Sequence, residues 1–139
     1  MEIESEAEVL QAFEKIRKKF FVRGVEFHKA VRLPEMTIIS CRGKIGALIG
    51  RKGMGVHELG RELNAKVRVV EQSKDGKKVV LDLIGNTRLL GLNEVFTPEG
   101  KTLKIIIDRR DSGKMDFSAE SLKKAAEELL ETKISVEFR

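Results

Sequence analysis

The stretch Lys44-Ile-Gly-Ala-Leu-Ile-Gly-Arg-Lys-Gly-Met-Gly-Val-His57 decides how the rest of this chain is interpreted. It begins with apolar residues at helical spacing, passes through the turn Gly50-Arg51-Lys52-Gly53, and leads into a second helical run. Glycine lets a backbone turn sharply and approach a ligand closely, because it carries no Cβ. A helix start just beyond such a turn presents free N–H groups to an anion. Two glycines around two cations therefore predict a contact with the backbone of a nucleic acid.

Charge is distributed unevenly along the 139 residues. The net charge of +5 is modest, so the overall composition indicates nucleic-acid binding only weakly. From Met36 to His57, however, the chain has no acidic residue. A basic segment around a glycine turn is more informative than the overall charge. The basic residues of this segment are Arg42, Lys44, Arg51 and Lys52.

Composition excludes several classes of protein. With 41% hydrophobic and 35% charged residues, the chain is typical of a folded soluble protein of one ordinary domain or two small ones. Cys41 is alone, which excludes a disulfide framework and a cysteine metal site. The N-terminus lacks the pattern of a signal peptide, and no run approaches a membrane span. We therefore expect a cytoplasmic protein with no membrane partner, no metal and no cofactor.

Hydrophobic periodicity predicts the elements of the first half. Val9, Phe13, Ile16 and Phe20 recur at three- and four-residue steps, which predicts an amphipathic helix. Alternation of apolar and polar residues follows, as in a half-exposed strand. The predicted order is a helix over 6–20, strands over 25–31 and 36–41, a short helix over 44–49, the glycine turn, a helix to about residue 64, and a strand over 66–71.

A polar connector, Ser73–Lys77, is the predicted boundary between two domains, 1–74 and 75–139. The apolar residues 79–90 then allow two interpretations, a helix interrupted near Gly85-Asn86 or a strand followed by a turn, and we favour the helix. Ser118 is a predicted N-cap, and Phe117 a predicted hydrophobic staple, for the helix that follows. The other predicted elements are strands over 92–97 and 102–108, a helix with the face Leu122, Ala125, Ala126, Leu129 and Leu130, and a strand over 134–138.

The second half repeats the first at an offset of 67 residues, so that predicted strands fall on strands and helices on helices. Under this offset the Gly50–Gly53 turn meets Phe117-Ser-Ala-Glu120. The second copy therefore keeps the framework but loses the glycine turn and its cations. We infer two modules, one equipped to bind a phosphate backbone and one that is not.

The order helix–strand–strand–helix–GxxG–helix–strand, with Ile49-Gly-Arg-Lys-Gly53, resembles a type II KH domain. The tandem arrangement is similar to the paired KH domains of archaeal NusA-like proteins, and Leu90–Gly100 is similar to the entry into their second domain. The resemblance implies an α+β fold of two KH type II-like modules, each a small three-stranded sheet with helices packed on one face. In this family both domains commonly carry a GxxG, whereas this chain shows only one.

The resemblance also implies a function, the binding of single-stranded RNA by a transcription elongation or termination factor. A KH domain clamps about four nucleotides with its GxxG loop. Leu48 would join the apolar platform for the bases, and the strand over 66–70 would read their edges. Without Trp or Tyr, we expect weak affinity and limited sequence preference. The implied RNA-binding residues are Gly50, Arg51, Lys52, Gly53, Lys44, Arg42, Ile45, Ile49 and Met54.

Another class of function stays open. The chain could be a scaffold that docks on RNA polymerase, a ribosomal particle or an RNA-processing enzyme through its second half. The RNA sequence, the pathway and the oligomeric state are left undetermined by the sequence.

Titratable residues outside the glycine turn have ordinary interpretations. His28 and His57 lack partners at ligand spacing, so we predict surface or hydrogen-bonded roles. A metal-dependent nuclease site at Asp108, Asp111 and Asp116 is a third hypothesis, but we favour a solvated loop of mixed charge. We therefore predict a protein that is not an enzyme. Lys15, Lys18 and Lys19 are predicted to be a solvated helix face, with a smaller chance of extending the RNA path.

Overall fold

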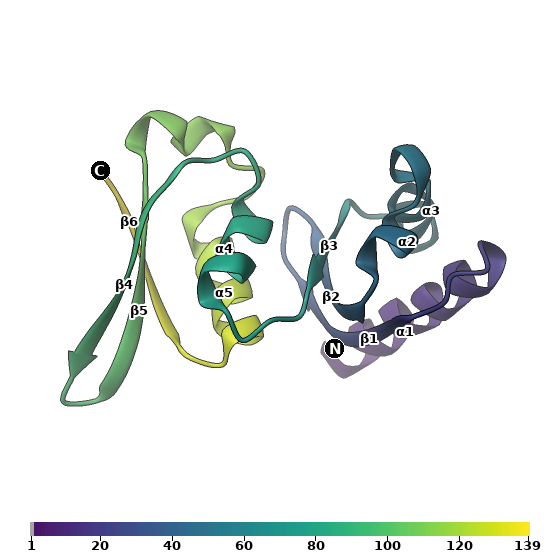
Figure 1. The fold of residues 1–139 in the computed structure, drawn as a ribbon, viewed down its shortest axis with the longest axis horizontal. Coiled ribbons are helices and arrows are strands. Elements are labelled where there is room, and N and C mark those ends of the chain that lie inside the picture. The colour runs from purple at the N-terminus through teal and green to yellow at the C-terminus, as the bar shows by residue number, and fades with distance from the viewer. Residues whose placement is uncertain (1) are drawn as a thin grey trace. The chain divides into compact units, whose positions relative to one another are not determined.

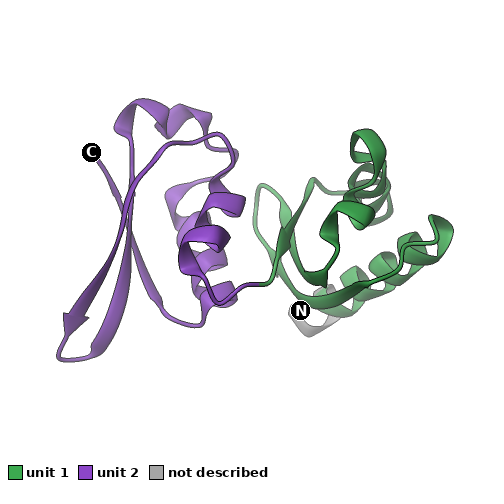
Figure 2. Ribbon diagram, viewed as in Figure 1, with its two compact units in different colours: residues 1–72 green, residues 73–139 purple. Residues whose placement is uncertain are grey.

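The computed structural model describes the backbone of residues 2–139 and the side chains of residues 6–139. The chain forms two compact units, residues 1–72 and 73–139 (Figure 2). Each unit is α+β, with a three-stranded mixed sheet and helices packed alongside it (Figure 1). This is the fold class that the sequence predicts, and it is consistent with two KH-like modules.

In unit 1 the sheet has the order β1-β2-β3, with β1 antiparallel and β3 parallel to the central strand. A parallel pair needs a crossover, and here the crossover is the short helix, the glycine turn and the helix that follows it. The elements are α1 (Glu2–Lys19), β1 (Val25–Arg32), β2 (Thr37–Gly43), α2 (Ile45–Ile49), the 3₁₀ helix η1 (Arg51–Gly53), α3 (Met54–Leu63) and β3 (Val67–Glu71).

The core of unit 1 lies between its sheet and its helices. Phe13 of α1 is buried and meets Phe27 of β1 edge to face, with ring centroids 5.7 Å apart. Leu48 of α2 and Leu59 of α3 are both fully buried in the same cluster. The helical spacing of apolar residues thus produces the expected buried faces, and α2 and α3 are anchored on either side of the glycine turn.

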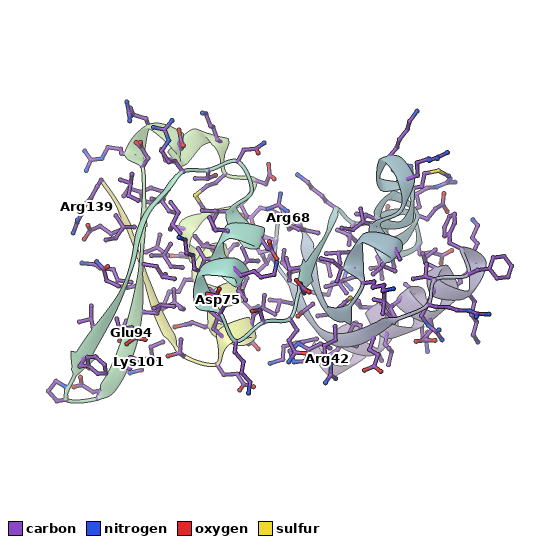
Figure 3. All side chains as sticks on the ribbon, viewed as in Figure 1. Arg42, Arg68, Asp75, Glu94, Lys101 and Arg139 are labelled. Atoms are coloured by element: carbon purple, nitrogen blue, oxygen red, sulfur yellow. The ribbon has the colours of Figure 1, made fainter. Side chains whose placement is uncertain are left out.

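Unit 2 has the same strand pairing, with the order β4-β5-β6. Glu94 and Lys101 face each other across the hairpin of β4 and β5, with Oε1 and Nζ 3.3 Å apart (Figure 3). The elements are α4 (Gly76–Ile84), β4 (Leu89–Thr97), β5 (Gly100–Ile107), the 3₁₀ helix η2 (Arg109–Lys114), α5 (Ala119–Leu130) and β6 (Lys133–Phe138).

Helix starts in unit 2 follow local capping rules. The Ser118 hydroxyl accepts a hydrogen bond from the Ser121 N–H at 3.1 Å, which confirms the predicted N-cap of α5, and Phe117 beside it is buried. The Asp75 carboxylate caps α4 in the same way, through the Lys77 N–H at 3.0 Å. The ambiguous segment 79–90 is helical only to Ile84, because the chain turns at Gly85 and enters β4 at Leu89. The favoured helix is therefore right as far as Ile84, and the expected interruption at Gly85-Asn86 is found, but the helix does not resume over residues 87–90.

The repeat predicted from the sequence is present in the order and pairing of the elements. Thr37 lies opposite Val67 in unit 1, and Leu103 lies opposite Ile134 in unit 2. The crossover of unit 2 is consequently one residue longer than the single offset of 67 implies. None of the helices in the described part of the chain is both long and apolar enough to cross a membrane.

Candidate nucleic-acid interface

The turn between α2 and α3 uses backbone conformations that favour glycine. Gly50 has φ 79° and Gly53 has φ 74°, in the half of φ space that residues with a Cβ rarely adopt. Lys52 between them also has a positive φ, of 55°. The Gly53 N–H donates to the Gly50 carbonyl at 3.1 Å, which closes the turn. A Cβ at Gly53 would meet no atom within 4 Å, so the turn is open to solvent rather than folded inward.

A close contact between α2 and α3 fixes the position of this turn. A Cβ placed on Gly55 would lie 1.8 Å from the Leu48 carbonyl oxygen, which is far inside van der Waals contact. Only glycine allows the first turn of α3 to approach the last turn of α2 so closely. The close approach packs the two helices against each other. The turn is therefore held in place by the buried contact between Leu48 and Gly55.

The two cations of the turn have no side-chain partners among residues 6–139. Arg51 and Lys52 are both exposed. Within residues 6–139, neither makes an ion pair or a side-chain hydrogen bond. The N-cap of α3 is Gly53, which has no side chain to satisfy the first N–H groups of that helix. The Met54 N–H, the first of that helix, donates instead to the Arg51 carbonyl. The two exposed positive charges thus lie at the positive end of the α3 dipole, where an anion would be stabilised.

A groove with a volume of about 570 Å³ continues from the turn along α3 to the start of β3. Its lining carries positive charge and no carboxylate. Arg61 belongs to it and also pairs with Glu58, with Nη1 and Oε1 3.4 Å apart. The lining residues are Lys52, Gly53, Val56, His57, Gly60, Arg61, Asn64, Ala65, Lys66 and Val67. Sequence reasoning missed Arg61, although its four-residue spacing from His57 places both on one helix face.

The predicted apolar platform is only partly available. Met54 is 54% exposed, and Ile45 and Ile49 are half-buried, so each presents some apolar surface. Leu48 is 0% exposed, and its predicted contact with bases is therefore wrong. The reason is periodicity, since the residue that anchors α2 in the core cannot also face solvent.

The predicted basic residues before α2 separate into two locations. Lys44 is exposed, and the end of its aliphatic stem lies near Gly24. Arg42 is exposed at the end of β2 but lines a different pocket, of about 740 Å³, together with Glu14 and Glu26. The pocket that Arg42 lines and the groove along α3 have no lining residue in common. The pocket of Arg42 also contains carboxylates, whereas the groove contains none.

In unit 2, the crossover that replaces the glycine turn is built around buried carboxylates. Asp108 and Asp111 are both buried, so the prediction that this segment is a solvated loop is wrong for these two residues. Asp108 accepts hydrogen bonds from Arg110 Nη2 at 2.9 Å, from its Nε at 3.2 Å and from its backbone N–H at 2.9 Å. These bonds hold the pKa of Asp108 well below its usual range, at about 2.

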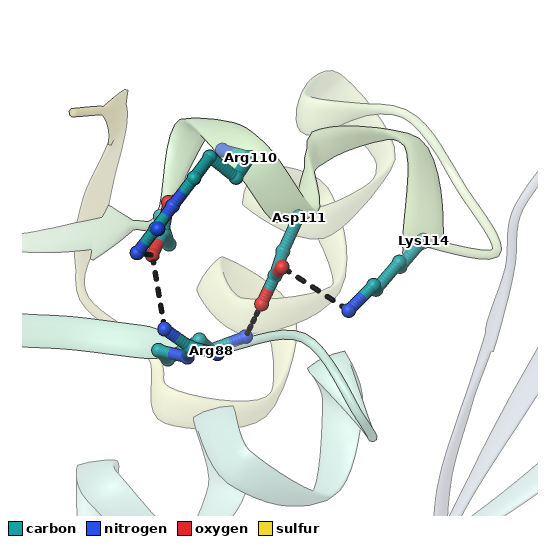
Figure 4. Close-up of polar contacts among 5 residues, drawn as sticks. Arg88, Arg110, Asp111 and Lys114 are labelled. Atoms are coloured by element: carbon teal, nitrogen blue, oxygen red, sulfur yellow. Dashed lines mark hydrogen bonds and ion pairs between the residues drawn. The ribbon is translucent and has the colours of Figure 1, made fainter.

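Asp111 ties η2 to the start of β4 (Figure 4). Its carboxylate accepts from the Arg88 N–H at 2.9 Å and lies 3.3 Å from Lys114 Nζ. The hydrogen bond from the Arg88 N–H, with Lys114 in addition, lowers the pKa of Asp111. Both carboxylates thus stabilise the backbone of this segment through hydrogen bonds. Oxygens that already accept these bonds are poorly placed to bind a metal ion as well.

Other titratable groups are likewise engaged in structural contacts. His28 Nδ1 lies 3.1 Å from Ser40 Oγ, as its predicted hydrogen-bonded role requires. Cys41 is buried, and desolvation raises the pKa of its thiol to about 12, so it is a poor nucleophile at neutral pH. Among the described residues, no group of three or more His, Cys, Asp or Glu side chains is arranged to hold a metal ion.

Comparison with known proteins bears on the fold. The sequence matches no protein-family model and no curated protein. Among solved structures, the chain is similar to the crystal structure of APE1850, with a TM-score of 0.71 and 20% sequence identity. The match covers 97% of this chain and 98% of that one. At this identity the likeness shows the fold alone, a fold that extends over both units.

Proposed function

We propose that this chain binds single-stranded RNA and that the Gly50–Gly53 turn clamps the RNA backbone. The observation that carries the proposal is an exposed turn with two glycines at positive φ and two cations that have no partner in residues 6–139. Side-chain-free backbone permits close approach of a sugar–phosphate strand, and the cations balance its charge. The resemblance to type II KH domains gives the same assignment.

The surroundings of the turn fit a single strand better than a duplex. Phosphates would lie against Arg51, Lys52 and the positive end of the α3 dipole. Bases would meet the partly exposed Ile45, Ile49 and Met54, and the groove along α3 would extend the positive surface. A short apolar strip beside cations suits unstacked bases, which a duplex does not offer.

The pathway that we propose is transcription, with the chain acting as a NusA-like elongation or termination factor. Its support is the tandem arrangement of two KH-like modules and the resemblance around Lys44–Glu71. A crosslinking map of the RNAs bound in cells tests this role. Enrichment of nascent transcripts is expected, whereas enrichment of ribosomal or transfer RNA would assign the protein to another pathway.

The test of RNA binding is charge reversal in the turn. Arg51→Asp combined with Lys52→Asp should abolish binding of a labelled single-stranded RNA while leaving the thermal melt nearly unchanged, because both side chains are exposed. Binding by the unmodified chain should weaken with salt by about 0.7 log units per log unit for each phosphate contacted. Lys123→Glu with Lys133→Glu is the matched control, since it changes the net charge equally at exposed positions of unit 2. Unaltered binding by the turn variant, or binding independent of salt, would reject the proposal.

A docking role for unit 2 is the second candidate, and exposed apolar residues on β4 favour it. Phe96 is 76% exposed, and Leu90 and Val95 are exposed on the same strand, which lies at the edge of its sheet. Edge strands with apolar side chains are common sites of protein association. Capture of RNA polymerase or a ribosomal component that survives nuclease treatment and is lost in Phe96→Ser would support it. Capture that depends on RNA would count against it.

A further inference from the structure

The aromatic side chain of Phe21 contributes nothing to the core of unit 1. It follows α1 with φ 54°, and it is 87% exposed. The left-handed region is unfavourable for residues with a Cβ, and for a bulky ring it is a clear outlier. An exposed ring also gains nothing from burial. Two unfavourable features at one residue point to a contact that is made outside the chain.

The turn itself explains the backbone but not the side chain. The Val22 N–H donates to the Arg17 carbonyl at 2.9 Å, and the Phe21 N–H donates to the Lys18 carbonyl at 3.3 Å. This is a Schellman motif, in which Val22 packs into the core and the residue before it takes a left-handed conformation. Glycine or asparagine is the ordinary choice at that residue. The motif therefore accounts for φ at Phe21 and leaves the choice of phenylalanine unexplained.

The surroundings of Phe21 are positively charged. From Lys15 to Val25 the chain has five basic residues and no acidic one. Lys15, Arg17 and Lys19 are paired with glutamates. Lys18 and Arg23 lie three residues before and two residues after Phe21 in the chain, are exposed, and have no ion pair within residues 6–139. An exposed aromatic ring in a basic segment has the chemistry that single-stranded nucleic acid requires, a surface for stacking and charges for phosphates.

Contacts between elements connect the end of α1 to both helices that carry the proposed clamp. Lys15 Nζ lies 2.8 Å from Glu62, and Lys19 Nζ lies 3.3 Å from Glu58, so α1 runs antiparallel to α3. The direction of α1 past Lys19 is therefore the direction of the N-terminus of α3, where the Gly50–Gly53 turn ends. On the other side, the Gly24 carbonyl accepts from the Lys44 N–H at 2.9 Å. The end of α1 is thus paired with α3, and the segment that follows it is bonded to the residue before α2.

We propose that Phe21 stacks on a base of the single-stranded RNA whose backbone the Gly50–Gly53 turn holds, with Lys18 and Arg23 contacting its phosphates. This inference rests on the proposed function and extends its site from the clamp to the end of α1. It supplies the aromatic contact that a chain without Trp or Tyr otherwise lacks. Binding then explains why a phenylalanine, rather than glycine or asparagine, occupies the left-handed position of the motif.

Phe21→Gly tests the inference by separating stability from binding. Glycine suits the left-handed position, so the variant should melt about 1–4 °C higher than the unmodified chain. Its affinity for a short single-stranded RNA of random sequence should fall about 5- to 30-fold, because one stacked base is lost. The dependence of binding on salt should stay the same, since no charge changes. Phe96→Ser removes a comparably exposed ring in unit 2 and should leave RNA affinity unaltered.

Phe21→Trp provides a second readout that does not depend on stability. The chain has no tryptophan, so this variant carries a single indole. The variant should bind RNA at least as tightly as the unmodified chain, and its emission should be quenched when RNA is added. Unchanged emission on saturation would overturn the inference.

The outcomes also distinguish this inference from the function on which it rests. Wild-type affinity in Phe21→Gly, together with loss of binding in the Arg51 and Lys52 double variant, would overturn the role of Phe21 alone. A chain that binds no single-stranded RNA would overturn both. Loss of a captured protein, with RNA affinity unchanged, would assign Phe21 to protein docking and overturn stacking.

Discussion

The crossovers of the two units occupy the same place in the same topology and are built in opposite ways. In unit 1 the crossover exposes Arg51 and Lys52 without side-chain partners in residues 6–139 and provides no side-chain cap for α3. In unit 2 the crossover buries Asp108 and Asp111, whose oxygens accept hydrogen bonds from η2 and from the start of β4. A segment whose polar groups are satisfied internally can shape a fold, whereas one that leaves them free can bind a ligand.

The difference extends into the helix that follows. Under the offset of 67, the positions of the Gly50–Gly53 turn correspond to Phe117–Glu120, which form the N-cap and first turn of α5. The Ser118 hydroxyl accepts from the Ser121 N–H, whereas the corresponding Met54 N–H of unit 1 donates to the Arg51 carbonyl of the turn. Gly55 corresponds to Leu122, which is fully buried. Where unit 1 brings two helices into close contact, unit 2 fills the space with a side chain.

Gly55→Ala should break the crossover of unit 1 and have the largest effect on stability. A Cβ 1.8 Å from the Leu48 carbonyl forces α2 and α3 apart, and we expect unit 1 to lose about 2–3 kcal/mol. RNA affinity should fall with it, because the turn is carried by both helices. Gly46→Ala is the matched control, since a Cβ there meets nothing within 4 Å. Equal melting temperatures for the two variants, measured by circular dichroism, would contradict this account of the clamp.

Acid should weaken the crossover of unit 2. The pKa of Asp108 is about 2 in the folded chain, below the value of about 3.9 for an unfolded aspartate. The stabilisation from Asp108 is therefore complete above about pH 4 and is lost as pH falls toward 2. Melting temperatures measured across this range should fall, and Asp108→Asn should lower stability at neutral pH and flatten the fall. Glu99→Gln, at the exposed tip of the β4–β5 hairpin, removes the same charge as a control. If the melting temperature of Asp108→Asn fell with pH as steeply as that of the unmodified chain, ionisation of Asp108 would not be the cause of the loss of stability.

Ser118→Ala should have the smallest of the three effects. Loss of the hydrogen bond to the Ser121 N–H removes the cap of α5 and should cost about 1 kcal/mol. RNA affinity should stay unchanged, because unit 2 carries no clamp in our proposal. Ser112→Ala, at an exposed position of η2, is the control for serine removal. A loss of RNA affinity in Ser118→Ala would indicate that unit 2 takes part in binding.

Local patterns predicted much of this fold. The amphipathic spacing in α1, α3 and α5, the alternation in the strands and the cap at Ser118 all depend on neighbours in sequence, and each is found in the structure. The segment 79–90 was harder, because a buried helix and a buried strand are both continuously apolar. There the break at Gly85, where φ is 61°, decides which part is helical.

The candidate site was predicted less completely than the fold. The Gly50–Gly53 turn and its cations are recognisable from residue types alone, and in the structure the two cations are exposed and the two glycines are half-buried. The burial of Leu48 and the separate pocket of Arg42 depend on contacts between elements. The buried state of Asp108 and Asp111 was missed for the same reason, since aspartates among cations are indistinguishable in sequence from a solvated loop.

By itself, the sequence determined two repeats of one α+β plan and a single glycine turn with two cations, because periodicity and glycine placement act over a few residues. Tertiary structure alone decided which charges are free. It buried Asp108 and Asp111, paired Lys15 and Lys19 with α3, and left Phe21 strained and exposed. The physical reason is that burial and pairing are properties of segments brought together from distant parts of the chain.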